Sequence, residues 1–313
     1  LVYHEGRAFR VVRVRIAVGS QQGEASQQRL PTLAARLCAA CGAAHFDIQD
    51  ERCHACQADL GNAEWVRELY RVDAVDTEPA ERITANDEER QRQAFELQTT
   101  FQWARRNGRI DARLLVARDA EGDIVQLRYS AGATITRINK GLRRRKDKNV
   151  FGFNLSPKTG YWQKDENEEA NAAAEPDPDK LPPQRVVPYV EDQKNALLLQ
   201  PAGACSDVTL ATVQYALKRG IESVFQLEES ELLAEPLPSR AERKGVLFYE
   251  ATEGGAGVLS RLVSEADALA RVAQTALRLL HLELPDDLAT LRQTPPADLQ
   301  DLPDTACVAG CYR

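Results

Sequence analysis

Four cysteines near the start of the chain stand in two closely spaced pairs. Cys38 and Cys41 form one CxxC motif, and Cys53 and Cys56 form a second after eleven intervening residues. Each CxxC places two sulfur atoms on one tight turn, and four thiolates complete the tetrahedron that zinc adopts at structural sites. The spacing therefore predicts a zinc ribbon at residues 36–60 with no open coordination position.

Two other chemistries are open to a cysteine cluster of this kind. A disulfide framework belongs to oxidising compartments, and a redox pair needs only one CxxC motif. Gly42 relieves the turn after the second cysteine, whereas His45 and His54 are expected to be spare residues rather than ligands. Such a ribbon either contacts nucleic acid or stabilises a strand-rich module with little core, and we favour the second.

A further cysteine pair, Cys307 and Cys311, stands at the end of the sequence. Two thiols alone rarely hold zinc, so either more ligands lie beyond Arg313 or Cys205 joins the pair, and we favour the first. Methionine is absent, including at position 1. We therefore expect the chain to be a fragment of a longer protein.

A glycine-rich turn is the most unusual motif of the second half. Gly254, Gly255 and Gly257 follow an expected strand and precede an expected helix, an arrangement that can hold a phosphate at a helix N-terminus. The motif lacks the lysine of a P-loop, and Glu250 and Glu253 would repel a phosphate. We favour a tight turn that allows close packing.

Four glutamates could form a carboxylate metal site for phosphodiester cleavage. Glu228, Glu231 and Glu235 follow the i, i+3, i+7 spacing of one helix face, and Glu250 could join them. A solvated or salt-bridged face is the favoured interpretation. A metal-dependent nuclease stays an alternative.

Seven cations gather within residues 137–148, although the net charge of the chain is −7. They are Arg137, Lys140, Arg143, Arg144, Arg145, Lys146 and Lys148. Cations at this density can neutralise several DNA phosphates, and the aromatic residues that follow could stack on unpaired bases. These aromatic residues are Phe151, Phe153, Tyr161 and Trp162. The competing interpretation is a solvated loop paired with the acidic stretch at 165–179.

Periodicity predicts the elements that position these groups. Alternating apolar and arginine residues predict a half-buried strand at 7–16. Further strands are expected at 65–75, 112–137 with a turn at 120–123, 196–199 and 245–250. Helices are expected at 87–103, across 226–235, from residue 208 and after residue 264.

Composition indicates a folded, mixed α+β protein. Hydrophobic residues make up 43% of the 313, with no apolar run long enough for a membrane span and no signal peptide, so we expect a cytoplasmic protein without membrane contact. We expect a β-rich module at 1–162 that contains the ribbon and the basic segment. An acidic, proline-rich linker at 163–184 separates it from a mixed α/β domain at 185–313.

Several unusual strings carry a resemblance to a known family. Residues 211–220, 225–232, 247–259 and 306–313, in this order, resemble the MrfA-type zinc-binding domain found at the C-terminal end of bacterial superfamily two helicases. The first half, with its ribbon and the string at 82–90, is similar to the preceding region of long anti-phage helicases of the DISARM and Druantia types.

The resemblance implies an ATP-dependent DNA helicase or translocase as the parent protein. It implies that Cys307 and Cys311 belong to a four-cysteine zinc site completed beyond Arg313. It also implies three kinds of partner: DNA, motor domains in the same polypeptide or complex, and other defence proteins. The chain has no Walker A lysine motif and no Asp-Glu-x-His box, so we expect no enzyme activity of its own. The nuclease and a protein-interaction scaffold without DNA contact are the alternatives.

Overall fold

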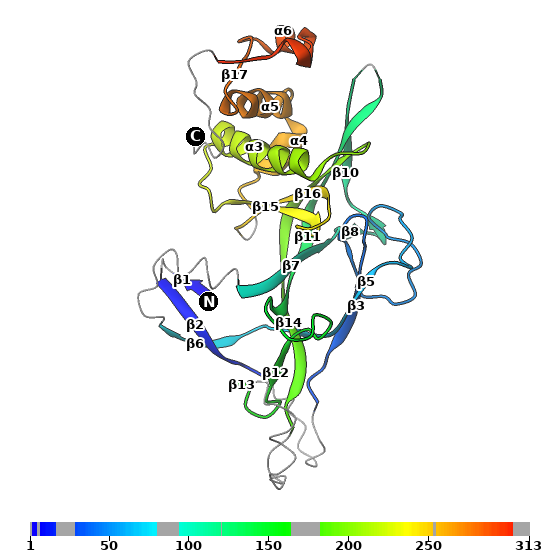
Figure 1. The fold of residues 1–313 in the computed structure, drawn as a ribbon, viewed down its shortest axis with the longest axis vertical. Helices are drawn as coiled ribbons and strands as arrows, with labels where there is room; N and C mark the ends of the chain where they lie inside the picture. Colours follow the sequence, from blue (N-terminus) through cyan, green and yellow to red (C-terminus); the bar gives the residue numbers. More distant parts are fainter. Residues whose placement is uncertain are drawn as a thin grey trace.

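The computed structural model of the protein describes residues 2–4, 7–16, 29–79, 94–119, 121–163, 182–252 and 255–302. Strands dominate these residues, and four α-helices gather at one end of an elongated molecule (Figure 1). The predicted α+β class is confirmed. In the described part, no helix is both long and apolar enough to cross a bilayer.

The first half of the chain contributes strands only. They are β1 (Val2–His4), β2 (Arg7–Val14), β3 (Leu33–Leu37), β4 (Ala44–His45), β5 (Glu64–Arg71), β6 (Val75–Pro79), β7 (Phe95–Gln102), β8 (Arg105–Arg106), β9 (Arg109–Ile110), β10 (Arg113–Arg118) and β11 (Asp123–Leu142).

The second half is mixed. It contains β12 (Phe153–Leu155), β13 (Trp162–Gln163), β14 (Gln184–Pro201), α3 (Asp207–Phe225), β15 (Leu232–Pro238), β16 (Arg243–Glu250), α4 (Val258–Ser264), α5 (Ala268–Leu279), β17 (Leu282–Glu283), α6 (Leu288–Gln293), a 3₁₀ turn (Pro296–Asp298) and β18 (Gln300–Asp301).

One large sheet organises the described residues. Its 11 strands include the path β10-β11-β14-β5-β3-β4, with β7 paired to β11, and β12 and β16 paired to β14. The long strands β11 and β14 run along the molecule and join its helical end to its opposite end (Figure 1). A separate small sheet contains β1, β2 and β6.

Near the helical end the sheet is covered on both faces. In β14, Leu197 and Leu199 pack in the apolar cluster under the helices, whereas Leu198 packs in the cluster that contains the ribbon cysteines. β16 alternates in the same way, with Phe248 toward the helices and Leu247 toward the cysteines. Because successive strand residues point to opposite faces, the helices and the ribbon form the two outer layers of a three-layer arrangement.

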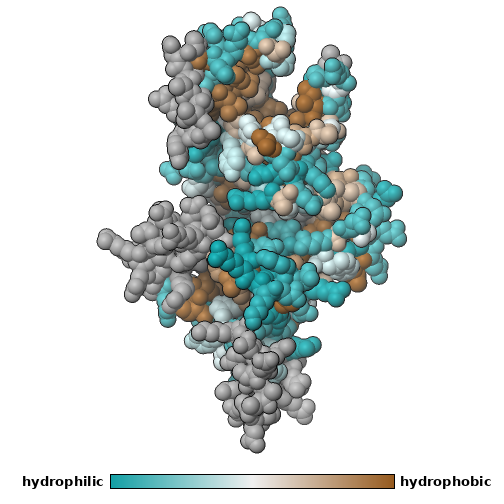
Figure 2. Space-filling model, in the orientation of Figure 1, coloured by the Kyte–Doolittle hydropathy of each residue, from teal (hydrophilic) through white to brown (hydrophobic). Residues whose placement is uncertain are grey.

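The helix predicted from residue 208 is confirmed as α3. Ser206 caps it, since its side chain accepts a hydrogen bond from the Thr209 backbone N–H at 3.0 Å. Leu210 and Ile221 are buried on its inner face. Figure 2 shows hydrophobic residues gathered over the helical end of an otherwise largely hydrophilic face.

Two predicted helices were wrong. The helix expected at 87–103 is strand β7 from Phe95, and residues 87–93 lie outside the described residues. Pairing with β11, which places Phe101 opposite Ile135, outweighs the local helical pattern. The helix expected across 226–235 is a turn followed by β15, whose prolines Pro236 and Pro238 are incompatible with a helix interior.

Strands from both sides of the predicted linker pair directly. β14 begins at Gln184 and pairs with β11, β5 and β12 from the first half of the chain. The predicted linker residues 164–181 lie outside the described residues. The boundary at 163–184 therefore divides the sequence within one sheet.

Candidate metal centre

The structure brings the four predicted cysteines of the ribbon together. The Sγ atoms of Cys38 and Cys56 lie 3.7 Å apart, and those of Cys41 and Cys53 lie 3.6 Å apart. All four sulfur atoms lie within 4.8 Å of one another. Zinc–sulfur bonds of about 2.3 Å give a tetrahedron with edges of about 3.8 Å. The four thiols therefore fit one zinc ion.

Two similar turns place these sulfur atoms. In the first, the Gly42 N–H donates to the Cys38 carbonyl at 2.8 Å; in the second, the Gln57 N–H donates to the Cys53 carbonyl at 2.9 Å. Gly42 and Gln57 both have left-handed backbones, with φ of 74° and 64°. A Cβ at Gly42 would lie 3.0 Å from a methyl carbon of Leu237, so glycine suits the turn that the sequence predicted.

Burial and mutual contact set the acidities of the thiols. The hydrogen bond with Cys41, followed by those with Cys53 and Cys56, lowers the pKa of Cys38. The corresponding bonds with Cys38, Cys53 and Cys56 raise the pKa of Cys41, and burial raises it further. Four such groups cannot all ionise without a cation between them. A zinc ion would replace their protons and close the site to further ligands.

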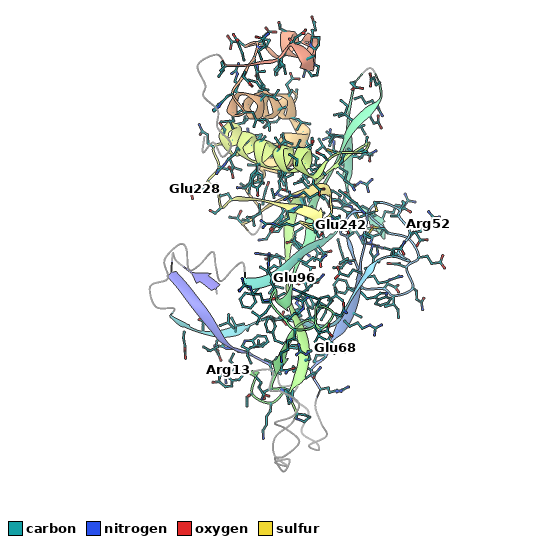
Figure 3. All side chains as sticks on the ribbon, in the orientation of Figure 1. Arg13, Arg52, Glu68, Glu96, Glu228 and Glu242 are labelled. Carbon is teal, nitrogen blue, oxygen red and sulfur yellow. The ribbon has the colours of Figure 1, made fainter. Side chains whose placement is uncertain are left out.

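The ribbon is docked firmly on the sheet. Thr100 of β7 donates to the Gly42 carbonyl at 2.5 Å, and Lys244 of β16 donates to the Ala39 carbonyl at 2.8 Å. Arg128 of β11 donates to the Ala55 carbonyl on the second turn. Arg52 marks the outer edge of the ribbon, away from these contacts (Figure 3). The cysteines thus form part of a layer, as expected for a structural centre.

Two histidines and an aspartate adjoin the cysteines. His45 Nε2 lies 3.4 Å from Cys53 Sγ, while His45 Nδ1 lies 3.1 Å from both Asp50 Oδ2 and His54 Nδ1. Burial, followed by the charge of His45, lowers the pKa of His54 to about 4. From the sequence, His45 and His54 were expected to be spare residues, and Asp50 was not singled out. The signal was present as three possible ligands within ten residues of the ribbon loop.

At the glycine-rich turn, Glu250 already occupies the position of a bound anion. Its carboxylate accepts hydrogen bonds from the backbone N–H groups of Gly257 at 3.0 Å and Leu259 at 2.8 Å, and from Asn195 at 3.1 Å. A Cβ at Gly255 would lie 1.9 Å from this carboxylate. This geometry favours a tight turn closed by an internal anion at the start of α4. Gly254 lies outside the described residues.

The other three glutamates of the predicted carboxylate site lie on β15 and on the turn before it. Glu235 is partly buried on β15, and burial raises its pKa, opposed by Arg137 and Arg240. Glu231 accepts a hydrogen bond from the Glu228 N–H at 2.8 Å, and Glu228 lies at the outer side of the helical end (Figure 3). Within the described ranges, no group of three or more possible metal ligands contains a glutamate.

The basic segment divides into structural and exposed cations. Lys140 is buried and forms an ion pair with Glu64 of β5. Arg145 forms an ion pair with Glu96 of β7 at 2.7 Å (Figure 3). Its guanidinium also stacks over the Phe151 ring. These contacts fix the middle of the segment to the sheet.

The remaining cations are largely exposed. Arg143 donates to the Phe95 carbonyl at 2.9 Å, and Lys148 donates to the Arg143 carbonyl. Arg137, Arg144 and Lys146 are exposed, and no ion pair engages them among the described residues. Arg137 also acts on Glu235 through its charge, so Arg144 and Lys146 are the two cations that remain available to a partner.

Of the aromatic residues predicted to stack on bases, Tyr161 is the most accessible. It is 51% exposed, and the Arg13 guanidinium lies 5.6 Å from its ring centre. Phe153 packs against Trp162 with ring centres 5.6 Å apart. The acidic stretch predicted to shield the basic segment lies outside the described residues.

A short basic hairpin was missed by the sequence analysis. Strands β8 and β9 pair around Asn107 and Gly108, both with positive φ, and place Arg105, Arg106 and Arg109 on an exposed loop. An Asn-Gly pair between two short runs is a strong signal for a two-residue hairpin turn. That signal could have located these arginines beside the ribbon.

The second cysteine pair cannot be placed. Cys307 and Cys311 lie outside the described residues. Cys205 is half-buried, and its thiol donates to the Ser206 carbonyl at 3.8 Å.

One family model matches part of the chain. Residues 213–313 match the MrfA Zn-binding domain. No curated protein matches the chain. Among solved structures, one match is described as the crystal structure of DUF1998 helicase MrfA bound to DNA. It has 12% identity and a TM-score of 0.32, and it covers 59% of this chain and 20% of that chain. The chain thus spans a fifth of that helicase.

The matched residues and the ribbon meet at the sheet. The match includes β15, β16 and α4–α6, and its cysteines are Cys307 and Cys311, whereas the four ribbon cysteines precede it. Leu237 and Leu247 of the matched strands pack in the same apolar cluster as the ribbon cysteines. Zinc is the metal in the family description and the metal that the four thiols fit.

Proposed function

From the match of residues 213–313 to the MrfA Zn-binding domain, we propose that the protein is an accessory, DNA-contacting region of an ATP-dependent superfamily two helicase or translocase. The match is the observation that carries the proposal. The sequence contains no Walker A lysine motif and no Asp-Glu-x-His box. In this proposal the ATP-hydrolysing motor domains are therefore a partner of this region. We also propose a cytoplasmic role in anti-phage defence, alongside other defence proteins.

In this proposal the zinc centre is a structural support. Zinc supplies rigid cross-linking of two turns that lie 15 residues apart when counted from Cys38 to Cys53. The ribbon covers the face of β14 and β16 opposite the helices. It thereby holds the sheet of the matched domain in a fixed shape and leaves the opposite end of β11 free to meet DNA.

The exposed cations at the end of β11 support DNA contact. Arg144 and Lys146 flank Arg145, which is anchored to Glu96. An anchored loop loses little conformational entropy when it binds, so its free cations can meet phosphates efficiently. Each neutralised phosphate releases counterions and adds to the salt dependence of binding.

A salt titration of DNA binding tests the proposal. In the doubly substituted variant Arg144→Ala/Lys146→Ala, we expect affinity for duplex and single-stranded DNA to fall about tenfold and the log–log salt slope to decrease by about 2. Fluorescence anisotropy at several salt concentrations measures both quantities. The matched control, Arg113→Ala/Arg118→Ala, removes the same charge from exposed positions of β10 and should change neither quantity to this extent.

The two negative outcomes have different meanings. If both variants lost the same amount of DNA affinity, the end of β11 would not be the surface that contacts DNA. No DNA affinity at low salt would favour a protein-interaction scaffold. In the full-length parent, the Arg144→Ala/Lys146→Ala substitutions should lower DNA-stimulated ATP hydrolysis and leave hydrolysis without DNA unchanged.

A further inference from the structure

Three possible metal ligands outside the four cysteines converge beside the ribbon. His45 Nδ1 lies 3.1 Å from Asp50 Oδ2 and 3.1 Å from His54 Nδ1, and the three ligand atoms all lie within 4.8 Å of one another. Nitrogen and oxygen ligands bound at about 2.1 Å to one ion lie roughly 2.9–3.4 Å apart. The spacing therefore suits a single small divalent ion.

His45 contacts the ribbon through one ring nitrogen and the cluster through the other. Its side chain is fully buried, and its Nε2 lies 3.4 Å from Cys53 Sγ. Its Nδ1 faces Asp50 Oδ2 and His54 Nδ1, each at 3.1 Å. Two ring nitrogens and a carboxylate oxygen at such distances can either share protons in hydrogen bonds or bind one metal cation between them.

This second cluster opens onto a hollow, unlike the closed set of four cysteines. His45, Asp50 and His54 line a hollow of about 700 Å³, and Trp103, Arg105 and Arg106 line it as well. Three protein ligands leave at least one coordination position for an outside molecule. An ion held here would thus be accessible from the hollow.

Two arginines, Arg105 and Arg106, line the hollow beside the cluster, and Asp47 and Asp111 line it too. Arg106 is paired with Asp111 at 2.9 Å, but no ion pair engages Arg105 among the described residues. Trp103 lines the hollow as well, and most of its side chain packs in the apolar cluster of the ribbon cysteines. A metal cation and a free guanidinium together match the oxygen atoms of a phosphate group.

We propose that His45, Asp50 and His54 bind a second divalent transition-metal ion whose open coordination positions take a phosphate group in this hollow. The site is separate from the structural zinc centre, although His45 contacts both. The ligand set of two histidines and one carboxylate is one that leaves positions open on the metal.

The number of metal ions bound per chain tests whether the second ion is present. After loading with excess zinc and desalting, we expect the wild-type chain to retain one more equivalent than His54→Asn or Asp50→Asn, by elemental analysis. Asp47→Asn is the matched control, because Asp47 lines the same hollow without belonging to the cluster. It should retain the wild-type stoichiometry. Equal stoichiometry in all four proteins would overturn the proposal and leave a shared proton between the three side chains.

Cobalt substitution separates a lost ligand from a lost fold. Cobalt bound by four thiolates gives strong sulfur-to-metal charge-transfer absorption, which should persist in His54→Asn and Asp50→Asn. If only one of these two variants loses the absorption, its four-cysteine site is disturbed, and the metal content of the other variant is compared with that of the wild type. If both lose it, the two sites are one structural unit and the proposal of a separate site is wrong.

Binding of inorganic phosphate tests whether the second ion has open coordination positions. In the cobalt-loaded wild type and in Asp47→Asn, we expect paramagnetic broadening of the phosphate ³¹P signal. The broadening should be lost in His54→Asn. In Arg105→Ala the phosphate affinity should fall about tenfold without a change in metal stoichiometry. A second equivalent of metal without ³¹P broadening would overturn the phosphate part of the proposal.

Discussion

Cys41 and Cys53 are almost fully buried thiols whose Sγ atoms lie 3.6 Å apart. Two turns bring these thiols together, and the hydrogen bond with Cys38, ahead of burial, raises the pKa of each. One zinc ion can bind all four thiolates through four strong bonds. The free energy of zinc binding then contributes directly to the stability of the fold.

Replacement of one ribbon cysteine should therefore remove the metal and much of the stability. For Cys41→Ser we expect loss of one zinc equivalent and a decrease of about 4 kcal/mol or more in the free energy of unfolding. Elemental analysis and chemical denaturation measure the two effects. Cys205→Ser is the matched control, because Cys205 is a half-buried thiol outside the ribbon, and it should retain zinc and stability. Equal zinc content in both variants would contradict a four-cysteine centre.

Glu235 provides a pH-dependent prediction. Burial raises its pKa above the ordinary value of 4.5, opposed by Arg137 and Arg240, so the folded state favours the protonated carboxyl. Its contribution to stability is present below the unfolded pKa and is lost as pH rises through the folded pKa. We expect Glu235→Gln to be more stable than wild type at pH 7, with the difference vanishing below about pH 4.5.

Denaturation curves at several pH values would measure this difference. The control is Glu228→Gln, at an exposed position, which should follow the wild-type curve throughout. A Glu235→Gln variant that is less stable than wild type at pH 7 would show that the two arginines outweigh burial.

The cysteines could be predicted from the sequence because ligand spacing is a local property. The role of Glu250 could not, since the carboxylate meets the N-terminus of α4 only after β16 is placed in the sheet. The same holds for Lys140 and Arg145. The density of charge predicted a surface segment, but their partners Glu64 and Glu96 come from distant strands.

At the scale of elements, β16 separates two apolar layers with alternate residues. Phe248 packs under the helices, and Leu247, its neighbour in sequence, packs toward the ribbon. Both side chains are almost fully buried. Truncation of either one creates a cavity, but the two cavities lie on opposite faces of the same strand.

This pair gives a test of the layering. We expect Leu247→Ala and Phe248→Ala each to lower the free energy of unfolding by about 2–5 kcal/mol. Only Leu247→Ala should also speed the loss of zinc to a chelator, because its cavity adjoins the cysteine cluster. Metal release followed with a colorimetric chelator, under conditions where both variants stay folded, measures the rate. Equal rates of zinc release from the two variants would show that the packing beneath the ribbon does not affect zinc retention.

Elements with a clear local period were predicted well, and elements set by distant pairing were not. α3 was found from its apolar spacing and β2 from its alternation. β14 was recognised only at 196–199, where both faces are apolar, although it extends from Gln184 to Pro201. Its first half pairs with β5 and β12, and its residues show no simple alternation because different partners cover different parts.

At the scale of the whole molecule, the two predicted modules share their largest sheet. β14 forms a long antiparallel ladder with β11 and a parallel pairing with β5. Gln184 adds two side-chain hydrogen bonds to the backbone of Leu30, at 2.7 and 3.2 Å. Separation of the halves would expose the edges of several long strands, and exposed edges promote aggregation.

We therefore expect that residues 1–163 and 182–313, expressed separately, do not fold on their own. Each piece should lack a cooperative thermal transition and should aggregate, because β11 and β14 supply each other's hydrogen bonds and apolar cover. The matched experiment places a protease site between Gln163 and Pro182 in the intact chain. After cleavage, the two pieces should elute together from a sizing column and keep the melting temperature of the uncut protein. Cooperative unfolding of both isolated pieces would instead establish the predicted linker as a true domain boundary.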